Sequence, residues 1–316
     1  YDGNVYGGGK GSSYFEITGT GTEADTTFYL NPTCGRVGGN TNVTITAGST
    51  KASVYGGGRL ALTGVDIDGK FVDENHGNTI INITGGTIGT SATDSLLICN
   101  YSVGDVFGSG KGDFENYQMV DAGRVTNSTI NISGDNTVIH GNVVGGGEMA
   151  GLGWWDDDAK YYANTGSSNI TIDGGSIGSP MELTYTEASN PGQWTMYENG
   201  QLIHTCTGNV FGGGQGDVDT ECPAWVSMGR ARETSVTING GTIMSCVYGG
   251  GEQGVVTGNT RVVVNDGTVG SFVNTSTNSF YFGGVYGAGY GSDDPSEDNS
   301  TAVNDSTLAR QAVDLE

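Results

Sequence analysis

The chain has 316 residues, of which 58 are glycine and only 5 are proline. Its 35 acidic and 12 basic residues give a formal charge of −23, which disfavours nucleic acid and anionic membranes as partners. No apolar run is long enough to cross a bilayer and no signal peptide opens the chain, so we expect no membrane insertion. Because the chain begins within a repeat, we expect it to be a piece of a longer protein.

One short motif recurs seven times: a valine, usually an aromatic residue, and then a glycine triplet or a near copy. The copies begin at Val5, Val54, Val106, Val143, Val210, Val247 and Val285. Recurrence of this kind predicts stacked repeats, with the valines in register along one inner wall. The following residues (Tyr6, Tyr55, Phe107, Phe211, Tyr248 and Tyr286) should point the other way. They form either an external stack packed under a loop or a stacking platform for sugars.

A second motif lies between the copies of the first, and in it apolar and polar residues alternate as in a half-buried strand. The inward residues are expected to be Val43, Ile45, Ile81, Ile83, Ile130, Ile132, Ile170, Ile172, Val236, Ile238, Val262 and Val264. Glycines that permit positive φ follow each copy, and then comes a short third strand. The sequence therefore predicts an all-β fold, a single-stranded parallel β-helix (β-solenoid) of about seven coils. Each coil has three short strands with loop insertions.

Two segments are expected from this pattern. Residues 1–291 form one continuous repeat domain, and residues 292–316 form an acidic cap, linker or tail. Insertions within the repeats should line up as a ridge along one edge, where solenoids often place their binding face.

The most singular insertion combines aromatic and acidic residues: Trp154, Trp155, Asp156, Asp157, Asp158, Tyr161 and Tyr162. On one interpretation these residues grip a sugar or a cation. On the other, the rings fold back onto the coil while the carboxylates stay in solvent.

Calcium is the one cofactor for which the sequence offers candidates. Asp217, Asp219 and Glu221 follow a glycine triplet and loosely resemble nonapeptide calcium repeats, although Val218 stands where that motif has Asp. The acidic group Asp66, Asp68, Asp73 and Glu74 is a second candidate.

The five cysteines (Cys34, Cys99, Cys206, Cys222 and Cys246) have no zinc-ligand spacing. We expect Cys246 to be a buried free thiol, and one disulfide using Cys206 or Cys222 is the alternative. The three histidines, His76, His140 and His204, lie beside no nucleophile motif, so we expect no enzyme.

The repeat motifs at 208–214, 83–89 and 247–252 resemble those of large glycine-rich secreted or surface proteins of gut Bacteroidota. This resemblance implies an exported, cell-surface bacterial protein of the adhesin or fibre type, and it supplies no catalytic residues.

Three functions follow from these observations. The first is a non-catalytic structural or adhesive β-helix that binds glycans or a host or cell-surface protein through its ridge, or associates end to end with itself. The alternative is a carbohydrate-active β-helix, a polysaccharide hydrolase or lyase, in which Asp156, Asp157, Asp158 and Asp217 would supply the carboxylates. Ice binding is more remote, because the outward residues mix Thr, Asn, Ser and Val instead of forming a regular threonine array.

Overall fold

The computed structural model describes residues 3–19, 25–31, 34–90, 104–113, 121–178, 197–198, 201–202, 208–216, 228–274 and 279–290. These residues form β-strands joined by turns and contain no helix, so the predicted all-β class is confirmed for them. Within these ranges no helix is long and apolar enough to cross a membrane. The predicted acidic segment 292–316 lies outside the described residues.

The Val-aromatic motif forms a parallel sheet of seven two-residue strands. These are β1 (Val5–Tyr6), β6 (Val54–Tyr55), β9 (Val106–Phe107), β12 (Val143–Val144), β16 (Val210–Phe211), β18 (Val247–Tyr248) and β23 (Val285–Tyr286). Each valine pairs with the valine of the next strand, which confirms the predicted stack. Below, a unit begins at one of these strands and ends before the next; units are numbered 1 to 7 in chain order, and unit 7 begins at β23.

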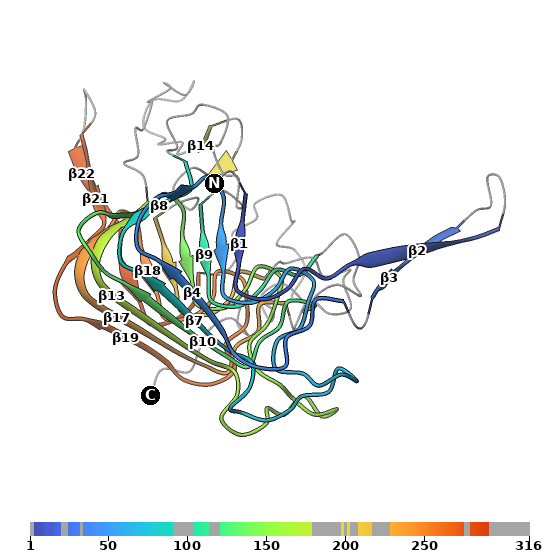
Figure 1. Ribbon diagram of the computed structural model, residues 1–316. Helices are drawn as coiled ribbons and strands as arrows, with labels where there is room; N and C mark the ends of the chain where they lie inside the picture. Colours follow the sequence, from blue (N-terminus) through green and yellow to red (C-terminus); the bar gives the residue numbers. More distant parts are fainter. Residues whose placement is uncertain are drawn as a thin grey trace, which may run out of the picture.

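The alternating motif forms a ten-stranded sheet that curls as a half-barrel (Figure 1). One limb contains β4 (Thr41–Ile45), β7 (Asn78–Ile83), β10 (Asn127–Ile132), β13 (Ser167–Ile177), β17 (Glu233–Ile243) and β19 (Thr260–Val264). The other contains β5 (Ser49–Thr50), β8 (Gly86–Ile88), β11 (Thr137–Ile139) and β20 (Thr268–Val269), together with the ends of β13 and β17. All neighbours are parallel, and β13 and β17 run through both limbs.

Within the described residues, three two-stranded antiparallel sheets lie apart from these two sheets. They are β2 (Ser13–Thr18) with β3 (Asp25–Leu30), β14 (Tyr197–Glu198) with β15 (Gln201–Leu202), and β21 (Ser271–Asn274) with β22 (Ser279–Phe282).

Valine and isoleucine fill the main core. Its buried members are Val43, Val54, Ile81, Ile83, Ile88, Val106, Ile130, Ile132, Ile139, Val143, Ile170, Ile172, Ile177, Val210, Val236, Ile238, Ile243 and Val247. Each such side chain contributes roughly 1.5–3 kcal/mol on burial. Two expected inward residues differ: Val264 is 44% exposed and Val285 is 49% exposed, because they belong to the last described strands of their sheets. A further small core of Val125, Leu152, Ala231 and Val256 was not predicted.

The glycine triplets recur because the backbones of successive units approach each other closely there. A Cβ atom on Gly56 would lie 2.3 Å from the carbonyl oxygen of Gly108, so no larger residue fits. The Gly56 and Gly108 carbonyls also accept hydrogen bonds of 2.6 Å from the hydroxyls of Thr41 and Thr79, in the second sheet.

The second residues of the Val-aromatic strands form a column of stacked rings on the side away from the valines. Ring centroids lie 4.7 Å apart for Tyr6 and Tyr55 and 5.0 Å apart for Tyr55 and Phe107. Phe211, Tyr248 and Tyr286 stack in the same way beyond Val144, at 5.0 Å. Tyr55, Phe107 and Phe211 are at most 1% exposed, so the inner part of the column is core and not an open platform for sugars.

A polar row precedes the valines. Five side chains each accept a hydrogen bond of 2.7–3.2 Å from the backbone N–H of the counterpart in the next unit: Asn4, Ser53, Asp105, Asn142 and Asn209. The last of these bonds comes from the backbone N–H of Cys246. Asp105 is the one carboxyl in this described row, and burial raises its pKa well above the usual value.

Cys246 is buried and free, as expected, and Cys34 is also free. Cys99, Cys206 and Cys222 lie outside the described residues, so the disulfide alternative stays untested.

The insertions follow a period of two units, which was not predicted. Units 1, 3 and 5 carry an insertion soon after the glycine triplet, at 12–33, 114–120 and 217–227. Units 2 and 4 carry one before the first strand of the second sheet, at 65–76 and 154–165. Units 2, 4 and 6 carry another before the next Val-aromatic strand, at 90–103, 179–207 and 271–282. The architecture therefore repeats every second unit.

Candidate functional site

Two insertions of the same kind project side by side from one edge of the molecule, at the lower right of Figure 1. They are the first hairpin, residues 64–77, and the second hairpin, residues 153–166. One antiparallel bridge closes each, Val65 with Phe71 and Trp155 with Tyr161.

Each hairpin leaves and rejoins the body through a pair of glycines with positive φ. In the second hairpin a Cβ on Gly153 would lie 2.5 Å from the Cα of Gly166. Gly64 and Gly77 form the corresponding pair in the first, where the distance is 2.8 Å. The close approach and the backbone conformation both exclude larger residues.

The two tips contain the same turn, Asp66-Ile67-Asp68-Gly69-Lys70 and Asp156-Asp157-Asp158-Ala159-Lys160. Asp66 Oδ1 accepts hydrogen bonds from the backbone N–H of Asp68 and Lys70, at 2.9 and 2.8 Å. Asp156 Oδ1 does the same for Asp158 and Lys160, at 3.1 and 2.9 Å. The first aspartate of each motif therefore shapes the turn, as Asx side chains commonly do.

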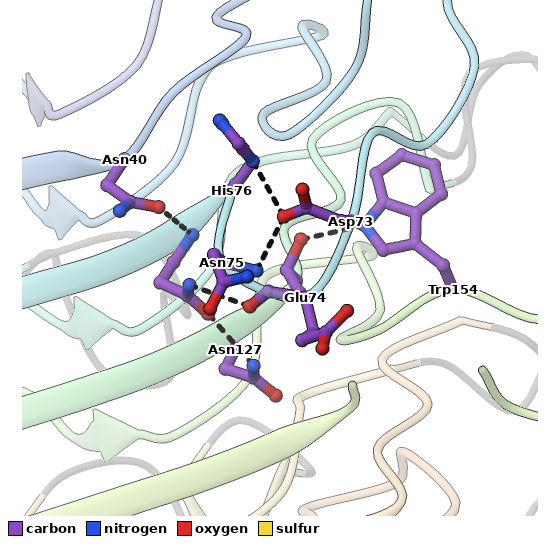
Figure 2. Close-up of polar contacts among 9 residues, drawn as sticks. Asn40, Asp73, Glu74, Asn75, His76, Asn127 and Trp154 are labelled. Carbon is purple, nitrogen blue, oxygen red and sulfur yellow. Dashed lines mark hydrogen bonds and ion pairs between the residues drawn. The ribbon is translucent and has the colours of Figure 1, made fainter. Parts of the chain in front are cut away.

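The ring of Phe71 joins the two hairpins. It stacks on Trp154 at 5.5 Å and on Tyr162 at 5.4 Å. Trp154 is buried, and its Nε1 donates to Thr126 Oγ1 at 2.9 Å (Figure 2). Tyr162 remains 44% exposed, so one face of the aromatic group is open to a ligand.

Two arginines flank Trp155 in the second hairpin. The guanidinium carbon of Arg124 lies 3.7 Å from the ring centroid of Trp155, and that of Arg230 lies 4.8 Å away. Arg230 also lies 4.6 Å from the ring centroid of Tyr161, which meets Trp155 edge-on at 5.4 Å. Such cation–π contacts hold the guanidinium planes in place.

The arginines occupy one register position in alternate units. Arg36, Arg124 and Arg230 each follow a glycine in units 1, 3 and 5, whereas units 2 and 4 carry the hairpins. Arg36 lies against the first hairpin, within 2.4 Å of a Cβ built on Gly69, and Arg230 Nη2 donates to the carbonyl of Ala159 in the second at 2.8 Å. Arginines and hairpins therefore alternate along the edge.

The predicted ligand-binding residues fall into two groups. Trp154 is buried, and Trp155 and Tyr161 are partly buried among the arginines. Burial also raises the pKa of Tyr161, whose hydroxyl has no hydrogen-bond partner. Asp157, Asp158 and Tyr162 are exposed. The rings thus mostly fold back onto the body, and the outward surface consists of carboxylates beside Tyr162.

A His–Asp pair lies at the end of the first hairpin (Figure 2). His76 Nδ1 and Asp73 Oδ1 are 2.7 Å apart, and the same oxygen accepts from the backbone N–H of Asn75 at 2.8 Å. Both hydrogen bonds lower the pKa of Asp73, and the one with His76 has the larger effect. Asn78 then ties this loop to Asn40 and Asn127 in the flanking units, at 2.8 Å each.

No three His, Cys, Asp or Glu side chains come together as a metal site within the described ranges. The candidate group Asp66, Asp68, Asp73 and Glu74 therefore does not form one. Asp217, Asp219 and Glu221 lie outside those ranges, and calcium binding there stays a prediction.

A second acidic group lies beside the aromatic column. Glu148 accepts a hydrogen bond from the Tyr55 hydroxyl and pairs with Lys111, which links units 2, 3 and 4. Burial is the largest cause of the raised pKa of Asp105, and the negative charges of Glu252 and Glu148 raise it further. Asp105 is 3% exposed and Glu252 is 5% exposed, whereas glycosidase carboxyls must reach a sugar. We therefore assign this group to packing.

Sequence analysis missed the glycine pairs and the arginine row. Two signals could have found them: the repeated Asp-x-Asp-[Gly/Ala]-Lys motif, and the Gly-Arg dipeptides that end at Arg36, Arg124 and Arg230.

The chain matches no protein-family model, no curated protein and no solved structure.

Proposed function

We propose that the chain is a parallel β-solenoid that serves as a non-catalytic scaffold and binds a glycan through its two hairpins. Continuous in-register pairing through all seven Val-aromatic strands supports the solenoid. The resemblance of its repeats to bacterial surface proteins supports a secreted or cell-surface location.

The observation that carries the binding proposal is the exposed ring of Tyr162, which Phe71 supports from behind and carboxylates adjoin. The apolar face of a sugar stacks on such a ring, and carboxylates accept hydrogen bonds from sugar hydroxyls. Asp157 and Asp158 are exposed in the same hairpin. A protein partner of the host or cell surface is the other class of ligand for this ridge.

The test is a glycan array with the purified chain, with and without calcium. We expect Tyr162→Ala to weaken binding about tenfold, which corresponds to roughly 1.4 kcal/mol. Ile17→Ala is the control, because Ile17 is 60% exposed in β2, away from the hairpins. Equal loss in both variants, or no glycan bound, would refute this assignment. New reducing ends or unsaturated products from a polysaccharide screen would favour the enzyme alternative, and thermal hysteresis would favour ice binding.

End-to-end self-association has its own supporting observation. Val285 and Tyr286 are each 49% exposed, whereas the corresponding Val54 and Tyr55 are fully buried. We propose that a second copy of the chain covers this last strand and continues the parallel pairing. Analytical ultracentrifugation should show assembly that increases with concentration, and Val285→Asp should abolish it. A concentration-independent monomer would contradict this proposal.

A further inference from the structure

The base of the second hairpin contains four donor atoms that are buried and have no hydrogen-bond partner. They are the hydroxyl of Tyr161 and the Nε atoms of Arg124, Arg230 and Arg232. A buried donor without an acceptor is destabilising, so native structures rarely keep several of them unless an ion or water supplies the acceptor.

These groups lie close together at the base of the second hairpin. The guanidinium groups of Arg124 and Arg230 both lie over Trp155, and that of Arg230 lies over Tyr161. The Tyr161 ring and the Cβ of Arg232 both face Gly166, within 2.6 and 2.8 Å of a Cβ built there.

Within the described residues, Arg230 has no ion-pair partner, in a chain whose overall charge is −23. Arg124 has a carboxylate partner, Asp121, at 3.0 Å. Arg232 lies 3.7 Å from Glu233, which is 52% exposed and so is screened by solvent. Arg230 donates a hydrogen bond to the neutral carbonyl of Ala159.

The aromatic contacts also hold the guanidinium groups before any ligand arrives. Stacking occupies the faces of the guanidinium planes and leaves their N–H edges for an acceptor. A guanidinium edge matches the oxygens of sulfate, phosphate and carboxylate, with two parallel N–H···O bonds.

We propose that Arg124, Arg230, Arg232 and Tyr161 form an oxyanion site, which takes sulfate, phosphate or an acid group of the same shape on a larger ligand. This site is independent of glycan binding at Tyr162, which lies on the outward face of the same hairpin.

The first experiment titrates the full chain with sodium sulfate in a calorimeter, against sodium chloride at matched ionic strength. We expect saturable binding that Arg230→Gln weakens about tenfold. Arg36→Gln is the matched control, because Arg36 occupies the same register position in unit 1, and its binding should equal that of the unmodified chain. Sulfate also stabilises folded proteins in general, but this effect is the same for the unmodified chain and both variants. It therefore does not produce a difference in affinity between Arg230→Gln and Arg36→Gln.

A second variant separates a loss of sulfate binding from a loss of folded structure. Tyr161→Phe keeps the ring contacts and removes the hydroxyl donor. We expect it to bind sulfate about threefold to tenfold more weakly, without a lower melting temperature in the absence of sulfate. A hydroxyl that serves only packing would leave sulfate affinity unchanged.

The source of the anion is decided with glucose 6-sulfate, glucose and inorganic sulfate as probes. Tighter binding of glucose 6-sulfate than of sulfate assigns the site to an acid group on a sugar, and equal binding assigns it to a free oxyanion. The proposal is overturned if sulfate binding does not saturate, if glucose binds as well as its sulfate, or if Arg230→Gln binds sulfate normally.

Discussion

The two hairpins share a backbone and differ in the side chains around it. Both have a glycine pair at the base and an aspartate that shapes the tip. The first closes with Val65 and Phe71 and carries a His–Asp pair, whereas the second closes with Trp155 and Tyr161 between two arginines. The two hairpins therefore share a frame and differ in their chemistry, so function should be sought where they differ.

The largest expected effect tests whether the glycine pairs at the base of the two hairpins contribute equally to stability. Gly64→Ala and Gly153→Ala should each destabilise the chain by about 2–4 kcal/mol, because the new Cβ meets the paired glycine at positive φ. Urea unfolding measures this. Gly39→Ala is the control, since a Cβ there meets nothing within 4 Å, and it should change stability by no more than about 0.5 kcal/mol. A Gly153→Ala protein as stable as Gly39→Ala would show that the pair is not required.

The ring of Phe71 tests whether the hairpins depend on each other. Phe71→Ala should cost about 1–3 kcal/mol, because it removes stacking on Trp154 and Tyr162 together. Tryptophan emission should change with it, although Phe71 belongs to the other hairpin. Ile67→Ala, at a residue that is 88% exposed at the tip, should leave both stability and emission unchanged. Independent hairpins would give no change in emission for either variant.

The comparison extends to the polar row, where unit 2 ends in Asp105 and units 3 and 4 end in Asn142 and Asn209 at the same position. Since burial raises the pKa of Asp105, the folded state keeps its proton after the unfolded state has lost it. Stability should therefore fall as pH rises above about 4.

Asp105→Asn should remove that loss. We expect it to stabilise the chain by about 1–3 kcal/mol at neutral pH and to have little effect near pH 3. Melting temperatures across pH check this, with Asp135→Asn at an exposed turn as the control. A stabilisation that does not depend on pH would refute the stated cause.

The smallest effect concerns the His–Asp pair of the first hairpin, where the second has Ala163. The lowered pKa of Asp73 means that its contribution is present above about pH 4 and disappears as pH falls through the folded-state value. Hydrogen exchange of the Asn75 amide, which donates to Asp73, should speed up in Asp73→Ala at neutral pH. Equal exchange in both proteins would show that the pair does not hold the loop.

Much of the fold was predictable because backbone pairing repeats the same residue types. Val210 and Val247 pair as expected, and the alternation from Ile130 to Ile132 marks the buried face correctly. Val264 and Val285 pair as expected but are exposed, since alternation gives the face of a strand but not whether another strand covers it.

The site was less predictable, because its geometry depends on contacts between units. Gly153 is one of 58 glycines, and only its approach to Gly166 distinguishes it. Trp155 and Asp156 were recognised because their segment combines aromatic and acidic residues. The arginines beside Trp155 come from units 3 and 5, so their contact with it could not be predicted from their positions in the sequence. The positions of Asp217, Asp219 and Glu221 remain untested.

Paired glycines also flank insertions 90–103 and 179–207, which differ about twofold in length. Gly89 meets Gly104, and Gly178 meets Gly208, with similar spacing in both cases. Each pair brings the two ends of its insertion together, so we expect that peptides of different length and sequence can be exchanged there without a change in the sheets. Such a chain could acquire new specificities one loop at a time, and it offers the protein engineer ready attachment points for grafted segments.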